Sequence, residues 1–380
     1  MGQTGGKGHI MALIVFIIIL SILIMVHEWG HFITAKRCGV KVEQFSLGFG
    51  PKLLSRVWDD TEFCLCIIPL GGYVKMAGDE RSRLTGSQEE FLSKPVGQKS
   101  FIVLMGPVVN LLLAYVCFWV VFMVGKVDLD ATAKKVPAVV GQVLAGSPAQ
   151  KAGLMPQDEV INIDDHPIVH WPDLQEYLSQ SKTPALKVVI KRKGQNIIKE
   201  VVPQDQVQKD IFGREHKIRR IGVAPLQVQK SQDIVIVRYN PIEALRQAAL
   251  ELGDITTKTY IALYEMLIGL RSPKEAMGII GMFFVIKFAL SIGFSFLLHI
   301  VGVISASLAL FNILPIIPLD GGHLLIFAIE KIRGKALSQK MDEIIVKMGM
   351  SLIITLALFV FYVDFERIGL IDHFIKIFRG

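Results

Sequence analysis

The sequence predicts an α-helical polytopic membrane protein with about four membrane-spanning helices, a membrane-associated β-hairpin element and one inserted extramembrane α+β domain. Three observations lead to this fold class. Hydrophobic residues make up 52% of the 380 residues and charged residues only 20%. The mean hydropathy of +0.48 is also high, so a bilayer is the expected solvent. Four apolar runs are long enough to cross it, and a stretch of soluble character, 126–240, separates the second run from the third.

The first span is expected within residues 1–37, where an apolar run at 10–35 is closed by Lys36 and Arg37. A helix over this run is long enough to span a bilayer. An N-terminal apolar run also resembles a secretory signal. No small-x-small cleavage site follows it, so we expect the segment to be retained.

The other spans follow from the same criterion of length and apolar character. Residues 101–125 contain no charged side chain, and Asn110 among them is expected to hydrogen-bond to another helix. The run 296–319 ends at Asp320. The expected order is a second span in 99–126, amphipathic or interfacial helices in 231–295, a third span in 296–322, a cytoplasmic loop in 323–343, and a fourth span with the C-terminal tail in 344–380.

Residues 38–98 predict a hairpin or small sheet, followed by a polar surface loop. Short β-rich runs at 62–69 and 73–76 are flanked by glycines, which is typical of strands joined by tight turns. The glycines of this segment are Gly48, Gly50, Gly71 and Gly72.

Residues 127–230 predict one extramembrane α+β domain. Alternating or β-rich runs indicate four strands, and a polar run with spaced apolar positions indicates a short helix. The expected strands are 139–143, 159–163, 186–191 and 197–202, and the expected helix is 172–179.

Basic residues set the expected orientation. Lys and Arg are concentrated in 35–99 and 331–347, which places both segments on the cytoplasmic side. The 126–240 domain and both termini are then extracytoplasmic. The net charge of +7 comes with no block of Lys and Arg that would follow phosphates, so no nucleic-acid partner is expected. The four cysteines are expected to be reduced, buried thiols.

The pentapeptide His27-Glu28-Trp29-Gly30-His31 matches the H-E-x-x-H pattern of zinc proteases. On a helix, positions i and i+4 share a face, so both imidazoles can reach one ion. Glu28 can then take a proton from a zinc-bound water. Ionisable groups at membrane depth are costly and are usually functional. The competing interpretation is a helix end whose side chains face lipid headgroups.

Two histidines leave a catalytic zinc short of protein ligands, because such sites use three plus an open position. Asp320 ends another apolar run, and Gly321 and Gly322 after it permit an unusual backbone. Its carboxylate is the natural third ligand. The alternative is an aspartate that caps a helix at the membrane interface. Zinc is favoured over other divalent ions by ligand type.

Three motifs resemble those of the site-2 protease family of intramembrane zinc metalloproteases: HEWGH, Gly106-Pro107-x-x-Asn110, and Asn312-x-x-Pro315-x-x-Pro318-Leu319-Asp320-Gly321. The order of the elements is similar to the bacterial RseP type, the regulator-of-sigma-E proteases, over nearly the whole chain. The resemblance implies zinc on His27, His31 and Asp320, with Glu28 as the general base.

The same resemblance implies a substrate and the elements that bind it. Asn312 and Pro315 are expected near the substrate strand, and the region 48–74, with its four glycines, resembles a membrane-dipping β-element that pairs with the substrate. Such pairing would replace the hydrogen bonds that an unwound transmembrane helix loses. The implied substrate is a single-span membrane protein, such as an anti-sigma factor or a remnant signal peptide, in the bacterial cytoplasmic (inner) membrane. Without the resemblance, the four glycines are also explained as residues of ordinary turns.

The segment Gly146-Ser147-Pro148-Ala149 and the following residues 152–164 resemble a PDZ domain of the bacterial-protease type. PDZ domains bind extended peptides or peptide C-termini by strand addition. The strand Ile221-Gly222-Val223 matches the groove edge of such domains. About one hundred residues leave room for one PDZ domain only. A closed groove that acts as a spacer is the alternative.

Three functions compete at this point. The first is a zinc endopeptidase that performs regulated intramembrane proteolysis. The second is a non-catalytic membrane scaffold that presents a PDZ domain, and it does not require His27, Glu28, His31 and Asp320 to be present together. The third is a transporter, which would show an inverted repeat of broken helices. The sequence contains the full candidate metal set and no such repeat, which favours the protease.

Overall fold

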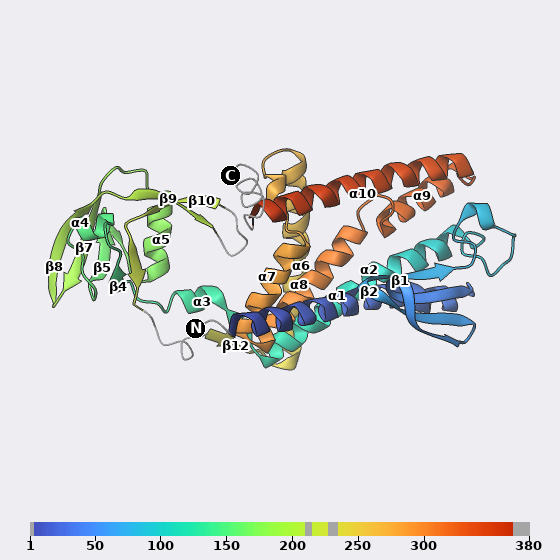
Figure 1. The fold of residues 1–380 in the computed structure, drawn as a ribbon, viewed down its shortest axis with the longest axis horizontal. Helices are drawn as coiled ribbons and strands as arrows, with labels where there is room; N and C mark the ends of the chain where they lie inside the picture. The colour runs from blue at the N-terminus through green and yellow to red at the C-terminus, as the bar shows by residue number, and fades with distance from the viewer. Residues whose placement is uncertain (1–3, 210–214, 227–234, 368–380) are drawn as a thin grey trace. The chain divides into compact units, whose positions relative to one another are not determined.

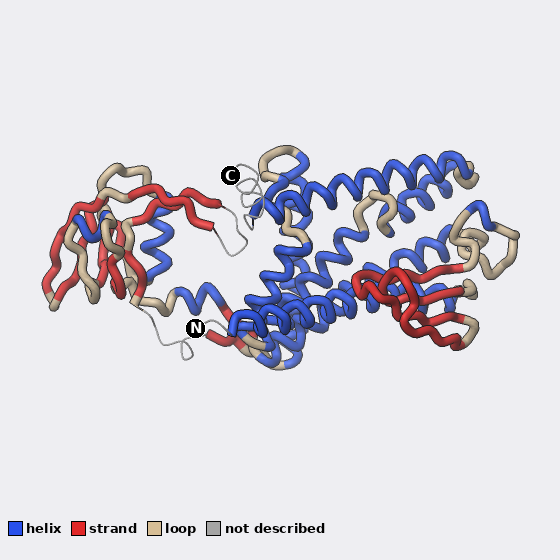
Figure 2. The backbone as a smooth tube through the Cα atoms, in the orientation of Figure 1, coloured by secondary structure: helices blue, strands red, loops and turns tan. Residues whose placement is uncertain are grey.

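The structure is a computed structural model, and it describes residues 4–209, 215–226 and 235–367. The chain divides into two compact units. The first, called here the membrane unit, comprises Met1–Val124 and Arg238–Gly380, and the second, the inserted unit, comprises Gly125–Val237. Figure 1 gives the labels of their helices and strands, and Figure 2 shows that the membrane unit is mainly helical whereas the inserted unit is rich in strands. The predicted boundary at residue 230 and the tail after Arg367 lie outside the described residues.

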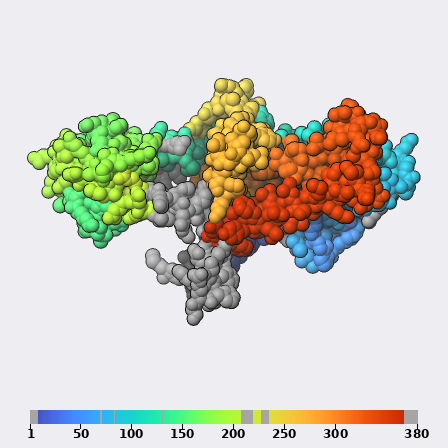
Figure 3. Space-filling model, turned by 90° about the horizontal axis from the view of Figure 1, so that it is seen from above, coloured from blue at the N-terminus to red at the C-terminus, as the bar shows by residue number. Residues whose placement is uncertain are grey.

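Within the described residues, four helices are long and apolar enough to cross a membrane. This confirms the number of spans expected from the four apolar runs. They belong to α1 (Thr4–Arg37), α2 (Val96–Val124), α8 (Phe294–Asn312) and α10 (Gln339–Arg367). Side chains of the most apolar window of α10 are not buried, and Figure 3 shows this helix in red along the outside of the membrane unit. A long apolar helix with so many exposed side chains is suited to face lipid on its outer side.

Small residues let the long helices approach one another closely. A Cβ on Gly30 of α1 would clash with the Met105 carbonyl group of α2, and a Cβ on Gly302 of α8 would lie 2.6 Å from the Phe118 ring of α2. The two contacts place α2 between α1 and α8.

The third span ends earlier than predicted. Helix α8 stops at Asn312, and Asp320 begins a new helix, α9 (Asp320–Arg333), instead of ending the old one. Pro315 and Pro318 explain the break, because proline supplies no backbone N–H and disfavours a helical residue before it. The prediction of a loop at 323–343 is therefore wrong for its first half. Apolar side chains of α9, Ile326 and Phe327, are buried in a core with α1 and α2.

The expectation that Gly321 and Gly322 adopt an unusual backbone is also wrong. Both residues lie inside α9, and neither has a positive φ. A Cβ on Gly321 would instead clash with the Ile313 carbonyl group, and one on Gly322 would lie 2.5 Å from the Ile317 nitrogen. These glycines are required because the turn before α9 packs directly on its first residues.

The predicted hairpin is present as β1 (Val42–Trp58) and β2 (Thr61–Met76). Asp59 and Asp60, both with positive φ, form the two-residue turn. Gln44 pairs with both Glu62 and Lys75, so the segment 42–47 lies between 61–65 and 72–76 in the sheet.

Shorter helices complete the membrane unit. α6 (Pro241–Leu267) begins where predicted, and the Asn240 side chain accepts a hydrogen bond from Glu243 N–H at its N-terminus. α7 (Ile279–Ile292) is capped from a distance, since the buried Asp364 of α10 accepts hydrogen bonds from backbone N–H groups at 278–281. Two single turns of 3-10 helix, Arg81–Arg83 and Pro273–Glu275, lie in loops.

The inserted unit is an α+β structure. Its largest sheet has four antiparallel strands in the order β6-β5-β7-β8, and three further pairs are β4 with β11, β9 with β10, and β3 with β12. The strands predicted at 139–143, 159–163, 186–191 and 197–202 and the helix at 172–179 are present as β4, β5, β7, β8 and α5. The bounds are β3 Lys126–Asp128, α3 Leu129–Ala133, β4 Val140–Val143, α4 Pro148–Lys151, β5 Glu159–Ile163, β6 His166–Pro167, α5 Trp171–Gln180, β7 Leu186–Arg192, β8 Gln195–Val201, β9 Gln204–Lys209, β10 Glu215–Arg220, β11 Val223–Pro225 and β12 Val235–Val237.

Candidate active site

His27, His31 and Asp320 converge on one point in the membrane unit. Nε2 of His27 lies 3.1 Å from Oδ2 of Asp320, Nε2 of His31 lies 3.5 Å from Oδ1, and the two Nε2 atoms are 3.2 Å apart. The histidines share one face of α1 because they are four residues apart, and the aspartate is the first residue of α9. The helix start at Asp320 therefore brings a carboxylate to the histidine pair from a position almost three hundred residues away.

Helix α2 fixes the orientation of the imidazoles. Nδ1 of His31 lies 3.0 Å from the Ile102 carbonyl oxygen, and this hydrogen bond directs Nε2 toward Asp320. Asn312, the last residue of α8, holds its Nδ2 atom 3.5 Å from Nε2 of His27. Both histidines are 8% exposed, so the cluster is nearly closed to solvent.

Gly106 of α2 makes room for the two rings. A Cβ at this position would overlap Nε2 of His31 and would lie 2.9 Å from Cε1 of His27. Sequence reasoning assigned Gly106 no place in the site. A glycine inside an uncharged span was the signal, but it does not by itself show which residues approach it.

A cavity of about 730 Å³ opens beside the cluster. Glu28, one residue after His27, lines it together with all three members of the cluster and Asn312. The other predicted substrate-binding residues do not line it, namely Pro315, Gly48, Gly50, Gly71 and Gly72. Gly72 is nevertheless close, because a Cβ there would lie 3.5 Å from Cγ of Glu28.

The strand segment 72–76 forms one wall of the cavity through Tyr73, Val74 and Met76. Among the described residues this segment pairs only with 42–47, so it is an edge of the sheet. The backbone N–H of Val74 also interacts with the Glu28 carboxylate. An unpaired strand edge therefore lies next to the candidate base.

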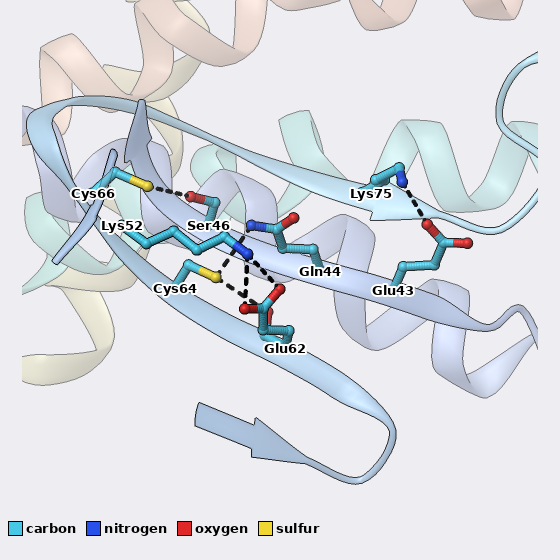
Figure 4. Close-up of polar contacts among 8 residues, drawn as sticks. All are labelled: Glu43, Gln44, Ser46, Lys52, Glu62, Cys64, Cys66 and Lys75. Atoms are coloured by element: carbon cyan, nitrogen blue, oxygen red, sulfur yellow. Dashed lines mark hydrogen bonds and ion pairs between the residues drawn. The ribbon is translucent and has the colours of Figure 1, made fainter. Parts of the chain in front are cut away.

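Polar contacts hold the sheet that carries this edge, as Figure 4 shows. Lys75 of the edge pairs with Glu43 at 2.7 Å, and the buried Ser46 hydroxyl lies 3.3 Å from the Cys66 sulfur. Gly48, Gly50 and Gly71 have positive φ values, which glycine adopts without strain. They lie where β1 and β2 bend, so turn chemistry accounts for their backbone.

The three converging residues fit a divalent metal ion. Their ligand atoms lie within 4.8 Å of one another, and the buried Oδ2 atom of Asp320 has no hydrogen-bond partner among the described residues. Two imidazoles and one carboxylate are a donor set that zinc accepts, with a further position left for water or substrate.

Charged residues that sequence reasoning did not select lie at another part of the cavity wall. Arg81 and Asp342 line the cavity, and Arg81 pairs with the buried Glu330 of α9. Lys99 of α2 lies 3.6 Å from the same carboxylate. These residues come from a polar loop and from the ends of three helices, and nothing in their sequence context indicates that they meet.

The inserted unit has a separate groove. Ile221, Gly222 and Val223 line a cavity of about 670 Å³ together with residues of α5, among them Trp171 and Leu178. The prediction of a strand at 221–223 is only partly right, because β11 begins at Val223 and Gly222 before it has a positive φ. The segment nevertheless faces α5 across an open space.

Known proteins that are similar to this chain are named as metalloproteases, which is consistent with a metal site at His27, His31 and Asp320. The model of "Peptidase family M50" matches residues 15–356. The chain is 32% identical to "Putative zinc metalloprotease R01501" of Rhizobium meliloti (strain 1021), covering 92% of this chain and 95% of the relative. It is 29% identical to "Metalloprotease MmpA" of Caulobacter vibrioides, covering 95% of this chain and 96% of the relative.

Among solved structures, the HtrA3 PDZ domain bound to a phage-derived ligand matches 21% of this chain and 79% of its own chain. The identity is 18% and the TM-score is 0.17, a value too low to establish a shared fold. The family model and the relatives, in contrast, extend over most of the chain and over both segments that form the cluster. The chain therefore belongs to peptidase family M50, the site-2 protease family, and is a membrane zinc metalloprotease.

Proposed function

We propose that this protein is an intramembrane endopeptidase that cuts single-span membrane proteins in regulated intramembrane proteolysis. The observation that carries the proposal is the convergence of His27, His31 and Asp320 beside Glu28, in a cavity walled by an unpaired strand edge. Both histidines lie in a helix long enough to cross a membrane. An anti-sigma factor or a remnant signal peptide is the class of substrate that fits.

His27, His31 and Asp320 would hold the Zn²⁺ ion. Zinc bound there supplies a Lewis acid that polarises the peptide carbonyl and makes water acidic enough to react near neutral pH. The Ile102 carbonyl oxygen keeps the His31 ring in the tautomer whose Nε2 faces the site. Gly106 leaves the space that both rings occupy.

Glu28 would act as the general base. Its carboxylate lines the same cavity and is positioned by the Val74 N–H group. It would take the proton of the attacking water and return it to the leaving amine nitrogen, so that hydrolysis releases a carboxylate and an amine.

The edge 72–76 would receive the substrate as an added strand. A transmembrane helix hides its carbonyl groups in i to i−4 hydrogen bonds, so one segment must unwind before it can be cut. An unpaired strand edge replaces the lost hydrogen bonds. Asn312 lies within reach of the cluster and would contact this segment, with Pro315 in the adjoining turn. Gly48, Gly50, Gly71 and Gly72 would shape the sheet that presents the edge.

The outer part of the sheet would rest against the bilayer. Leu54, Val57 and Trp58 are each 69% exposed, and apolar side chains in this number favour a lipid surface. With the basic loops on the cytoplasmic side, the inserted unit and both termini would be extracytoplasmic, in the cytoplasmic (inner) membrane of a bacterium.

The inserted unit would be one PDZ domain within 127–230 that binds an extended peptide or a peptide C-terminus. The groove between α5 and the segment Ile221-Gly222-Val223, which leads into β11, supports this proposal. A peptide could pair with the strand while its side chains contact Trp171 and Leu178. A non-catalytic scaffold built on this groove is the alternative function, and it leaves the metal cluster unexplained.

The decisive experiment combines zinc content with cleavage of a tagged single-span substrate in detergent. We expect about one zinc per wild-type chain, loss of zinc and cleavage in Asp320→Ala, and loss of cleavage with zinc retained in Glu28→Gln. Unchanged zinc content in Asp320→Ala would remove this residue from the metal site. Near-normal turnover in Glu28→Gln would end its assignment as base. A folded wild-type protein without zinc or cleavage would favour the scaffold.

A further inference from the structure

Asn110 is a buried amide in the wall of the catalytic cavity, and the reaction described above does not use it. It lies in α2, is 0% exposed, and is one of the cavity-lining residues. Among the described residues, neither Oδ1 nor Nδ2 of its side chain has a hydrogen-bond partner. A buried carboxamide without a protein partner is costly, so it requires an explanation.

Helix contact does not explain the side chain. The Ser305 hydroxyl of α8 donates a 2.8 Å hydrogen bond to the backbone carbonyl oxygen of Asn110, not to its carboxamide. Any residue at position 110 would offer this carbonyl group. The expected role of a polar residue in a span, a side-chain bond to another helix, is therefore not the role of Asn110.

The position of Asn110 relative to the metal cluster follows from helix geometry. Gly106 contacts the rings of His27 and His31, and Asn110 is one helical turn, about 5.4 Å, further along the same face. Ile24 of α1 and Leu308 of α8 line the cavity as well. Both are apolar, whereas Asn312 of α8 already lies near His27. Among the described residues that line the cavity, Asn110 is the hydrogen-bonding side chain contributed by α2.

We propose that the Asn110 carboxamide binds the peptide backbone of the unwound substrate next to the bond that is cut. Oδ1 would accept from a backbone N–H group and Nδ2 would donate to a backbone carbonyl oxygen, which satisfies both unpartnered atoms. An extended chain rises about 3.3 Å per residue, so one helical turn corresponds to one or two residues from the scissile bond. The proposal deepens the intramembrane protease function and rests on it.

Recognition of the backbone has a consequence for the range of substrates. Every peptide offers the same N–H and C=O groups, so this contact would select for an unwound segment and not for a side-chain sequence. A helical segment has these groups already paired and would gain nothing from Asn110.

The test uses synthetic single-span peptides with full-length protein in micelles. In each peptide one amide near the cut, but never the scissile amide, is replaced by an ester, which removes one N–H donor. For wild type we expect one such ester, one or two residues from the cut, to lower kcat/KM about tenfold. In Asn110→Leu, kcat/KM is already reduced about tenfold, and the same ester has no further effect. Asn110→Ala serves as a second variant that creates space instead of filling it.

Ser305→Ala is the matched control, because it removes the hydrogen bond from α8 to the Asn110 backbone and leaves the carboxamide in place. It should keep the ester effect of wild type whatever it does to the melting temperature. An ester effect of equal size in wild type and both Asn110 variants would overturn the proposal, as would loss of zinc in both variants. Failure of wild type to cut any peptide would instead count against the proposed function itself, so the two failures are distinguishable.

Discussion

The membrane unit contains two buried groups of ionisable side chains that differ in how their charges are matched. One is the metal cluster of His27, His31 and Asp320. The other, called here the Glu330 cluster, consists of Glu330, Arg81, Lys99 and Asp342. Residues of both groups line the same cavity. The difference in charge pairing therefore does not come from a difference in location.

In the Glu330 cluster every charge has a partner. Arg81 pairs with Glu330 and lies 3.4 Å from Asp342, while Lys99 lies 3.6 Å from Glu330 and 4.8 Å from the centre of the Phe327 ring. The Leu337 N–H group donates a further 2.9 Å hydrogen bond to Glu330. Buried charges of this kind are matched by cations and hydrogen bonds.

In the metal cluster the matching is incomplete. Imidazole nitrogens and carboxylate oxygens, all atoms with lone pairs, point at one another, and no Lys or Arg lies within ion-pair distance of Asp320 among the described residues. Two imidazoles and a carboxylate directed at one point form a donor set that suits a cation. A buried carboxylate that is paired with Arg and Lys, such as Glu330, stabilises the packing of helices and loops. A buried carboxylate that contacts only histidines, such as Asp320, is suited to bind a metal ion.

The largest effect is expected from a variant that disturbs the metal cluster without changing a charge. Gly106→Ala places a methyl group where the His31 ring lies. We expect zinc to be lost and cleavage to fall about 10³-fold, because displaced ligands lose both affinity and geometry. Zinc analysis and a cleavage assay on the same preparation measure the effect.

Gly97→Ala is the matched control for that variant. Gly97 lies in the same helix, and a Cβ there meets no atom within 4 Å. Its zinc content and activity should equal those of wild type. Normal zinc content in Gly106→Ala would mean that α1 and α2 can separate, and that the glycine is not a requirement of the site.

The sequence predicted those parts of the site that helix periodicity determines. His27 and His31 share a face because residues four apart do so on any helix, and the structure places them beside Asp320. The role of Gly106 was not predictable in the same way. That role depends on where along their lengths α1 and α2 cross. The residues next to a glycine in an apolar run do not indicate which side chain of another helix will contact it.

The fold was predictable where hydrophobic length or alternation decides it, as for the four spans and for β4, β5, β7 and β8 of the inserted unit. The prediction failed at the end of α8, where apolar residues continue to Leu319 although Pro315 and Pro318 stop the helix. It also failed for α9, whose burial against α1 and α2 is a tertiary effect. The double pairing of residues 42–47 could not be predicted, because alternation does not reveal the partner of a strand.

A second prediction concerns the Glu330 cluster. Glu330→Gln keeps the shape of the side chain but leaves Arg81 and Lys99 without their buried anion, and we expect the free energy of unfolding to fall by about 3 kcal/mol. Zinc content should not change. Unfolding in mixed micelles with increasing denaturing detergent, together with metal analysis, measures both quantities.

Glu343→Gln provides the comparison for this variant. Glu343 is exposed and lies 3.9 Å from the exposed Lys347, so its loss should change stability by less than about 0.5 kcal/mol. If Glu330→Gln also lowered the free energy of unfolding by less than about 0.5 kcal/mol, the Glu330 cluster would contribute little to stability. It would then not differ from the metal cluster by a structural role.

The smallest effect is expected at Asp158 in the inserted unit. There, too, a buried carboxylate is paired with a cation, Arg192. This buried carboxylate accepts hydrogen bonds of 2.7 and 2.8 Å from Arg192 and one of 2.8 Å from the Met155 N–H group. Burial acts to raise the pKa of Asp158, but these hydrogen bonds outweigh it and hold the pKa below its usual value. The resulting stabilisation is therefore present above about pH 4, where the unfolded carboxyl ionises, and is lost as the pH falls through the lower folded pKa.

Asp158→Asn should remove this stabilisation, about 2 kcal/mol at pH 7. We expect faster hydrogen exchange in β5 and β7 of the full-length variant at pH 7. After correction for the intrinsic exchange rate, the difference from wild type should shrink below about pH 4 and disappear as the pH falls through the lower folded pKa of Asp158. The exposed Asp165, changed to Asn, should leave both profiles as in wild type. A difference that persisted at low pH would show that the shape of the side chain, and not its matched charge, stabilises this part of the fold.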